Sequence, residues 1–226
     1  MEADINKDVV IITSEALKRI RSISGVCELF HSLQRFDGVT YLHSENVARL
    51  SAVIGRQLSL REDKLIDLAV SGYLHDIGKI SLGIDIIGKP DKLTEEEYAE
   101  VKEHPRLGYL FLRPFIQDKD ILSGVLEHHE RLSGDGYIRG LQGKEISLFG
   151  RILGAADVFD AITSIRPYKK AQSCTDAIQM MSAQKGFDPD VVEVLKKIYT
   201  GGNFYDVRVL ECQAWCLYGQ SEFIPL

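Results

Sequence analysis

Helical periodicity is the feature of this sequence that most restricts its fold. Apolar residues recur at steps of three and four in nearly every window of the 226-residue chain, and no long stretch alternates with a period of two. A chain of this length can bury one sizeable core, but not two full-size domains with separate functions. The sequence therefore predicts an all-α fold in which a single domain of several helices surrounds one core.

The same periodicity, read with capping and glycine signals, predicts where the helices lie. Helices are expected over about Ser14–Leu33, Thr40–Leu58, 63–77, 121–129 and 146–165, with two shorter ones that begin at Ser173 and at Asp188-Pro189. Thr94 and Glu97 form a capping box that should open one more helix, which Pro105 should kink. Gly78 is expected to end the helix that begins at 63. The glycine-rich segments 133–143 and 201–202 are predicted loops.

Composition excludes several classes of protein. No apolar run approaches the ~20 residues that span a bilayer, and the N-terminus lacks the pattern of a secretory signal, so we expect a cytoplasmic protein without a membrane segment. The four cysteines form no CxxC pair, which favours free thiols over a zinc site. The net charge of −6 argues against binding to a nucleic acid polymer, because such binding needs a basic face.

Histidines and aspartates fall at or beside the apolar stripes of the predicted helices. Five of the six histidines take part, and the set comprises His43, His75, Asp76, His104, His128, His129 and Asp157. One such histidine would be a satisfied core residue, but burying the whole set is costly unless its members are paired or bind metal. Mixed imidazole and carboxylate ligands suit iron, manganese, zinc or similar ions rather than a metal that prefers thiolates. Of these we favour iron or manganese, with zinc, nickel and magnesium left open. The sequence therefore predicts a buried metal centre.

Several motifs resemble those of the HD-GYP class of HD-domain phosphohydrolases. His75-Asp76-Ile77-Gly78-Lys79 is similar to its HD-x-G-K signature, and the string 128–137 resembles the HHE…DGxGYP element. Further matching blocks surround His104 and Asp157 and continue to residues 166–169, so that the resemblance runs from Asp37 to about Val192. It implies a metal-dependent phosphodiesterase whose substrate is a cyclic dinucleotide, with cyclic di-GMP favoured. The product would be the linear dinucleotide, and further hydrolysis to GMP is left open.

The resemblance also implies roles for individual residues. Asp76 would bridge two divalent metal ions, with His43, His75 and Asp157 around one ion and His104, His128 and His129 around the other. A water shared by the two ions would be the nucleophile. Lys79 is the expected catalytic cation beside a phosphate oxygen, although a solvated lysine at a helix end explains it equally well. The resemblance further implies substrate contacts from Lys79, Tyr137, Arg166 and Lys169.

Two positions depart from the family pattern. Ile138 replaces the proline of the GYP tripeptide, which removes a fixed φ and should give a looser loop. Val39 stands where some members carry a glutamate that binds a third metal, so we expect two ions. Asp160 is either a partner that orients a histidine or a surface charge.

Other functions stay open at this stage. A general HD phosphohydrolase acting on another nucleotide would share the metal motif but would not need the loop at 130–144. A cyclic-dinucleotide sensor without activity would have lost ligands, and a scaffold with a structural metal would use a closed mononuclear site. We expect an N-terminal helical extension at 1–36, a catalytic domain at 37–200 and a tail of unassigned structure at 201–226. Regulatory input would come from a protein partner or from the tail, and a homodimer is left open.

Overall fold

The computed structural model describes residues 2–87, 89, 91–164 and 171–200. In chain order the helices are α1 (Glu2–Ser22), α2 (Ser24–Phe36), α3 (Gly38–Gln57), α4 (Glu62–Leu74), η1 (Ile77–Ser81), α5 (Ile84–Ile87), α6 (Glu95–Val101), α7 (His104–Leu112), α8 (Lys119–Glu127), η2 (Gly143–Glu145), α9 (Leu148–Thr163), α10 (Cys174–Ala183) and α11 (Pro189–Thr200), of which η1 and η2 are 3-10 helices. The described residues contain no strand, which confirms the predicted all-α class.

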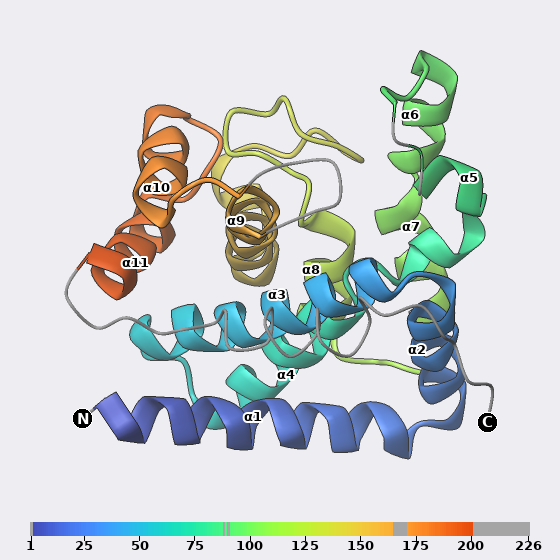
Figure 1. Ribbon diagram of the computed structural model, residues 1–226. Coiled ribbons are helices and arrows are strands. Elements are labelled where there is room, and N and C mark those ends of the chain that lie inside the picture. The colour runs from blue at the N-terminus through green and yellow to red at the C-terminus, as the bar shows by residue number, and fades with distance from the viewer. Residues whose placement is uncertain (1, 88, 90, 165–170, 201–226) are drawn as a thin grey trace.

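Helices α3 and α4 form the centre of the fold. They pack against each other, and most of the longer helices pack against one of the two. Figure 1 shows α1 running along one side of this pair, while α9, α10 and α11 lie on the opposite side. The core divides into two apolar clusters, one between α3, α9, α10 and α11 and the other between α1, α2, α4, α7 and α8. The N-terminal segment therefore shares a core with the rest of the described chain.

The single helix predicted over Ser14–Leu33 is wrong. Ile23 has extended backbone angles, φ −105° and ψ 103°, and it separates α1 from α2. The turn brings Gly25 against the ring of Phe115, where a Cβ on Gly25 would lie 2.4 Å from ring carbons. A change of direction that is stabilised by contact with a distant residue leaves no mark on the local periodicity, so the pattern runs through the break.

The kink predicted at Pro105 is a full break between two helices. The capping box of Thr94 and Glu97 is confirmed, but α6 ends at Val101 and a new helix begins at His104. Pro105 lies in the first turn of α7, where its missing N–H leaves no helical hydrogen bond unmade. This break makes His104 the first residue of a helix rather than a residue in the middle of one.

The helix predicted over 63–77 also ends early. It stops at Leu74, and the chain continues through a turn into η1. Gly78 does not cap the helix. It lies against α7, where a Cβ on Gly78 would come within 2.0 Å of the carbonyl oxygen of His104. Gly78 is therefore explained by close packing of two backbones, which brings the turn after α4 next to the start of α7.

Other helix ends follow the predicted signals. Asp37 caps α3 by accepting from the backbone N–H groups of Val39 and Thr40, at 3.1 and 2.9 Å, close to the predicted start. Ser173 caps α10, and Pro189 begins α11, as predicted. Among the described residues, no helix has both the length and the apolar character that a membrane crossing requires.

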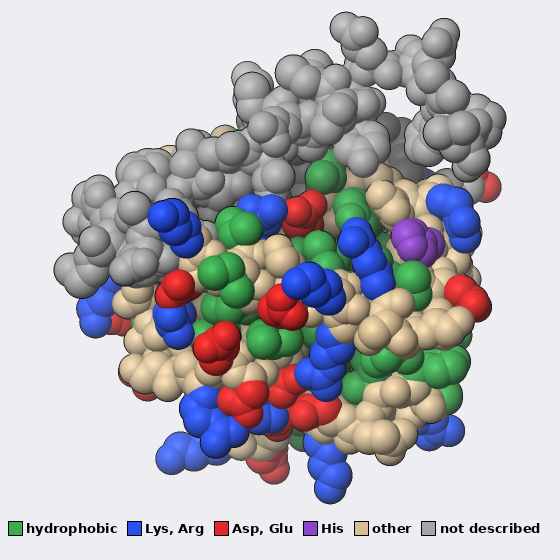
Figure 2. All heavy atoms as spheres, turned by 90° about the horizontal axis from the view of Figure 1, so that it is seen from below, with side chains coloured by type: hydrophobic (Ala, Val, Ile, Leu, Met, Phe, Trp, Pro, Cys, Tyr) green, Lys and Arg blue, Asp and Glu red, His purple; other side chains and the backbone are tan. Residues whose placement is uncertain are grey.

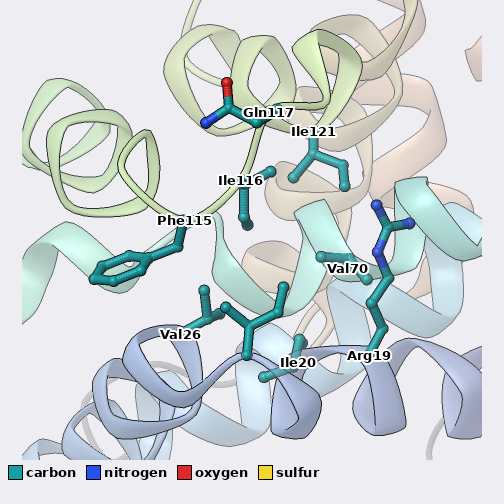
Figure 3. Close-up of a pocket in the computed structure, with 9 residues that line it drawn as sticks. Arg19, Ile20, Val26, Val70, Phe115, Ile116, Gln117 and Ile121 are labelled. Carbon is teal, nitrogen blue, oxygen red and sulfur yellow. The ribbon is translucent and has the colours of Figure 1, made fainter.

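The surface on the α1 side is mixed in charge. Figure 2 shows this face with Lys and Arg side chains interspersed among Asp and Glu and among hydrophobic groups. Positive charge is therefore not gathered into one patch on the described part of this face. A small hollow lies where α1 and α2 meet the segment before α8, and it is lined mainly by apolar side chains such as Ile20, Val26 and Ile116 (Figure 3). The charged residue in its wall, Arg19, pairs with Asp67.

Candidate metal centre

Turns and helix ends bring the predicted histidines and aspartates together. His43 lies on α3, His75 and Asp76 follow the end of α4, and Asp157 lies on α9. His104 begins α7, while His128 and His129 follow the end of α8. We call these residues the His/Asp cluster: His43, His75, Asp76, His104, His128, His129 and Asp157. All are buried except His129, which is half-buried.

One group within the cluster consists of His43, His75 and Asp157. One ligand atom from each lies within 4.8 Å of the others, as a shared metal ion requires. The Nε2 atom of His43 lies 2.9 Å from Oδ1 of Asp157. The second group consists of His104, His128 and His129, whose ligand atoms meet the same criterion. The two Nε2 atoms of His104 and His128 are 3.1 Å apart.

The carboxylate of Asp76 lies between the two groups. Its Oδ1 is 3.2 Å from Nε2 of His104, in the second group. Its Oδ2 is 3.3 Å from Nε2 of His75 and 4.0 Å from Nε2 of His43, both in the first group. One carboxylate thus presents a different oxygen to each group, which is the arrangement that a bridging ligand needs.

Backbone contacts aim three of the histidine rings into the cluster. His75, His104 and His128 each donate from Nδ1 to the carbonyl oxygen three residues earlier, at 2.7 to 2.8 Å. This bond fixes the tautomer and leaves Nε2 as the atom that faces the cluster, as in many metal-binding histidines. Nε2 of His75 is buried and makes no hydrogen bond to any described residue. A metal ion would satisfy this atom, so the donor set fits metal binding.

Asp160 and Asn46 hold the fourth ring, which belongs to His43. Oδ2 of Asp160 lies 2.6 Å from Nδ1 of His43, and Asn46 donates to Oδ1 of Asp160 at 3.0 Å. The sequence left Asp160 as either a partner that orients a histidine or a surface charge. Because Asp160 is buried and contacts His43, the geometry matches the first interpretation. The sequence did not single out Asn46. Its place one turn after His43, on the same side of the helix, is the only local signal.

Charges in the cluster favour the protonation states that metal ligands need. Burial lowers the pKa of His128 well below its usual value and lowers that of His129 to about 3, so both rings are neutral. Burial opposes ionisation of Asp76, but the charges of His75 and Lys79 outweigh it and hold the pKa of Asp76 well below its usual range. Metal ions bind the neutral imidazole and the ionised carboxylate, which are the forms of His128, His129 and Asp76 here.

His43 differs from the other rings because it contacts two carboxylates. Burial lowers its pKa, but hydrogen bonds with Asp157 and Asp160 outweigh burial and raise the pKa of His43 to about 9. The same contact helps to hold the pKa of Asp157 well below its usual range. A metal ion on Nε2 of His43 would compete with this proton.

Lys79 contacts the cluster directly. Its Nζ lies 2.7 Å from Oδ2 of Asp76, and 22% of its side chain is exposed. Lys79 is therefore partly buried and paired, and its charge stabilises the ionised form of Asp76. The ammonium group lies at the edge of the cluster, where a phosphate oxygen could share it.

The loop after α8 covers His129. The ring of Tyr137 stacks on the ring of His129, with centroids 4.7 Å apart and an angle of 23° between the planes. Glu130 is buried, and its two carboxylate oxygens accept from the backbone N–H groups of Arg139 and Leu141, at 2.7 and 2.9 Å. In the sequence, Glu130 stands out only as a member of the motif at 128–137. The structure gives it a role in holding the loop.

Arg166, Lys169 and Val39 are the remaining positions that the sequence singled out. Arg166 and Lys169 lie outside the described residues, so their expected contacts stay predictions. Val39 lies one turn before His43 on α3, and it is 45% exposed. Its apolar side chain offers no ligand atom.

Comparison with known proteins agrees with this geometry. A family model described as HD domain matches residues 20–191. The chain is 39% identical over 181 residues to a protein of Xanthomonas campestris named as a cyclic di-GMP phosphodiesterase response regulator. The alignment covers 77% of this chain and 47% of that protein. It is also 38% identical over 157 residues to a Vibrio cholerae protein named 3'3'-cGAMP-specific phosphodiesterase 3. This second alignment covers 69% of this chain and 34% of that protein. The chain therefore spans less than half the length of these relatives.

A solved structure supports the same fold. Bd1817, described as an HDG"Y"P protein from Bdellovibrio bacteriovorus, aligns with a TM-score of 0.60 over 89% of this chain and 65% of that chain. The two sequences are 17% identical in this alignment, so the likeness concerns the fold alone. The match of the family model over most of the chain, together with the relatives, establishes the family. This chain belongs to the HD domain family, in its HD-GYP branch.

Proposed function

We propose that this chain is a metal-dependent phosphodiesterase that hydrolyses a cyclic dinucleotide, with cyclic di-GMP as the favoured substrate. The observation that carries the proposal is the position of Asp76, whose two oxygens face the two histidine groups separately. A single metal ion would not need a carboxylate placed in this way. Enzymes that cleave phosphodiesters commonly use a pair of ions that share a carboxylate.

The proposal assigns two divalent ions to the His/Asp cluster. His43, His75 and Asp157 would hold one ion, and His104, His128 and His129 would hold the other, with Asp76 shared. The donor set mixes imidazoles with carboxylates and contains no thiolate, which suits iron and manganese, the ions that we favour. When bound, the two ions would supply an activated water for attack and would relieve charge on the phosphoryl oxygens.

Residues at the edge of the cluster would bind and position the substrate. Lys79 stabilises the ionised Asp76 and would offer its remaining N–H groups to an oxygen of the scissile phosphate. Tyr137 shields one face of His129 from water, and its exposed part would contact a nucleobase. Arg166 and Lys169 are proposed to hold the second half of the dinucleotide, on the resemblance alone.

The substrate class rests on the relatives. One is named for cyclic di-GMP and the other for 3'3'-cGAMP, and both substrates are cyclic dinucleotides with two phosphodiester bonds. We propose the linear dinucleotide as the first product and GMP as the product of a second cleavage. The proposed catalytic domain spans 37–200, and a protein partner or a second copy of the chain would supply regulation.

The test is a hydrolysis assay on the metal-loaded chain. The protein is incubated with cyclic di-GMP or with 3'3'-cGAMP, and the products are resolved over time. We expect a linear dinucleotide from at least one of them, and no product from the Asp76→Asn variant, which keeps the size of the side chain but removes its charge. Hydrolysis of mononucleotides alone would identify a general phosphohydrolase, and tight binding without turnover would identify a sensor. Either result would contradict the proposal.

A further inference from the structure

Helix α6 is held in place although it contributes nothing to the core. None of its residues is buried. The capping box of Thr94 and Glu97 closes its N-terminus, and Nζ of Lys89 contacts both carboxylate oxygens of Glu97, at 2.8 and 2.7 Å. Short helices normally persist because they bury an apolar face. Core packing therefore does not explain why this helix stands where it does.

The end of α6 is joined directly to the His/Asp cluster. The carbonyl oxygen of Val101, the last residue of α6, accepts from Nδ1 of His104 at 2.7 Å. Figure 1 shows α6 at the end of the molecule away from α1, with the loop after α8 reaching toward it. The C-terminal end of α6 therefore lies beside the cluster residue His104.

Lys102, the residue after α6, lies near the rings of both Tyr98 and Tyr137. Tyr98 and Lys102 are one helical turn apart, and Nζ of Lys102 lies 4.5 Å from the centre of the Tyr98 ring. The same Nζ lies 5.7 Å from the centre of the Tyr137 ring, which stacks on His129. We call Tyr98, Lys102 and Tyr137 the rim. It forms a continuous path of aromatic and cationic groups from solvent to the cluster.

The charge and exposure of the rim point to a ligand. Tyr98 is 48% exposed, and a large ring so exposed gains little from its position in the folded protein. No carboxylate of the described residues forms an ion pair with Lys102, whereas the neighbouring Glu103 pairs with Arg106. An ammonium group between two rings keeps N–H groups available for an acceptor while cation–π attraction holds its position.

We propose that Tyr98 and Lys102 form a nucleotide-binding subsite of this enzyme. The ring of Tyr98 stacks on a purine, and Lys102 donates to an acceptor oxygen of the same nucleotide. This inference rests on the proposed function, because the occupant is one half of the cyclic dinucleotide. Stacking platforms of this kind accept any base, since every base has a π-face. The rim thus explains binding of a dinucleotide but not a choice between guanine and adenine.

The experiment compares two substrates on the metal-loaded full chain. Steady-state kcat and KM are measured for cyclic di-GMP and for bis(p-nitrophenyl) phosphate, a small phosphodiester without a purine. We expect Tyr98→Ala to raise KM for cyclic di-GMP by roughly tenfold, because loss of one base stack has about that effect. Lys102→Ala should raise KM by roughly tenfold as well, because it removes a charged hydrogen-bond donor. The kcat values and the cleavage of the small substrate should stay unchanged.

Two further variants serve as controls. Tyr98→Phe keeps the ring and should behave as the wild type, and Lys18→Ala removes an exposed lysine of α1, far from the rim. Unchanged KM values in Tyr98→Ala and Lys102→Ala would overturn the inference while leaving the proposed function intact. Equal losses on both substrates would also overturn it, because the segment would then support the metal centre.

The wild type separates the two proposals. If it binds cyclic di-GMP without turnover, the proposed function fails, and dissociation constants from calorimetry replace KM in the same comparison of variants. If it neither binds nor hydrolyses a cyclic dinucleotide, both proposals are overturned.

Discussion

The His/Asp cluster and the rim lie side by side but are built in different ways. Cluster side chains are almost all buried, and four of the five histidine rings are aimed by backbone carbonyls or by Asp160. Rim side chains are half-buried or exposed and stand on a short helix and a loop. Preorganised groups suit the chemical step, which tolerates little displacement of ligands, whereas an exposed surface suits binding of a large substrate. Changes in the two regions should therefore have different kinetic signatures.

The largest effect is expected from Asp76→Ala. Because this carboxylate faces both histidine groups, its loss should abolish activity and metal retention together. Helical content should stay largely intact, since the change removes only one small part of the core. Turnover, metal content and circular dichroism of the purified variant test this. Turnover near that of the wild type would refute the role of Asp76.

Asp160→Ala should have the next largest effect, although Asp160 belongs to neither group of ligands. It removes the partner of Nδ1 of His43, and loss of such partners typically costs roughly 10- to 100-fold in metal affinity or activity. Metal titration and kcat measure the loss. Asp160→Asn keeps an oxygen that can accept from the ring and should lose less. A variant Asp160→Ala with wild-type metal affinity and kcat would show that the ring needs no such partner.

Much of the cluster can be predicted from helical phase, because burial follows the apolar stripe. His43 and Asp157 illustrate this, since both lie on helices close to the predicted bounds. The phase argument is less accurate at His75 and His128, which lie just beyond the ends of their helices. Local sequence does not indicate where a helix ends because of packing against a distant segment.

The contacts of Lys79 and Tyr137 are harder to predict. The sequence alone does not decide whether Lys79 faces a phosphate or solvent. Its pairing with Asp76 depends on the tight turn after α4. Stacking of Tyr137 on His129 depends on a loop that Glu130 holds from within. Both are long-range or turn-dependent contacts, for which periodicity carries no signal.

A smaller effect, confined to binding, is expected when Arg166 and Lys169 are both changed to alanine. If they contact the distant half of the dinucleotide, KM for cyclic di-GMP should rise several-fold, while bis(p-nitrophenyl) phosphate should be cleaved as by the wild type. A double change of the exposed Lys18 and Arg61 is the matched control. Equal losses on both substrates would show that the pair supports the fold or the chemistry instead.

The smallest effect is expected from Val39→Glu. Val39 lies one turn before His43, so a carboxylate there would extend toward an ion beside the first group. We expect partial binding of a third ion, measured by elemental analysis, with little change in turnover. Val10→Glu places the same charge at an exposed position of α1 and should bind no extra metal. A third ion in both variants would mean that the added metal binds nonspecifically.

Anomalous diffraction from crystals of the metal-loaded, unmodified chain tests the central claim most directly. We predict two metal peaks, one beside His43, His75 and Asp157 and the other beside His104, His128 and His129, with Asp76 between them. A single peak would mean that Asp76 does not bridge two ions, and three well-occupied peaks would mean that the third ion has ligands other than the residue at position 39. Either pattern would contradict a centre of two ions that share Asp76.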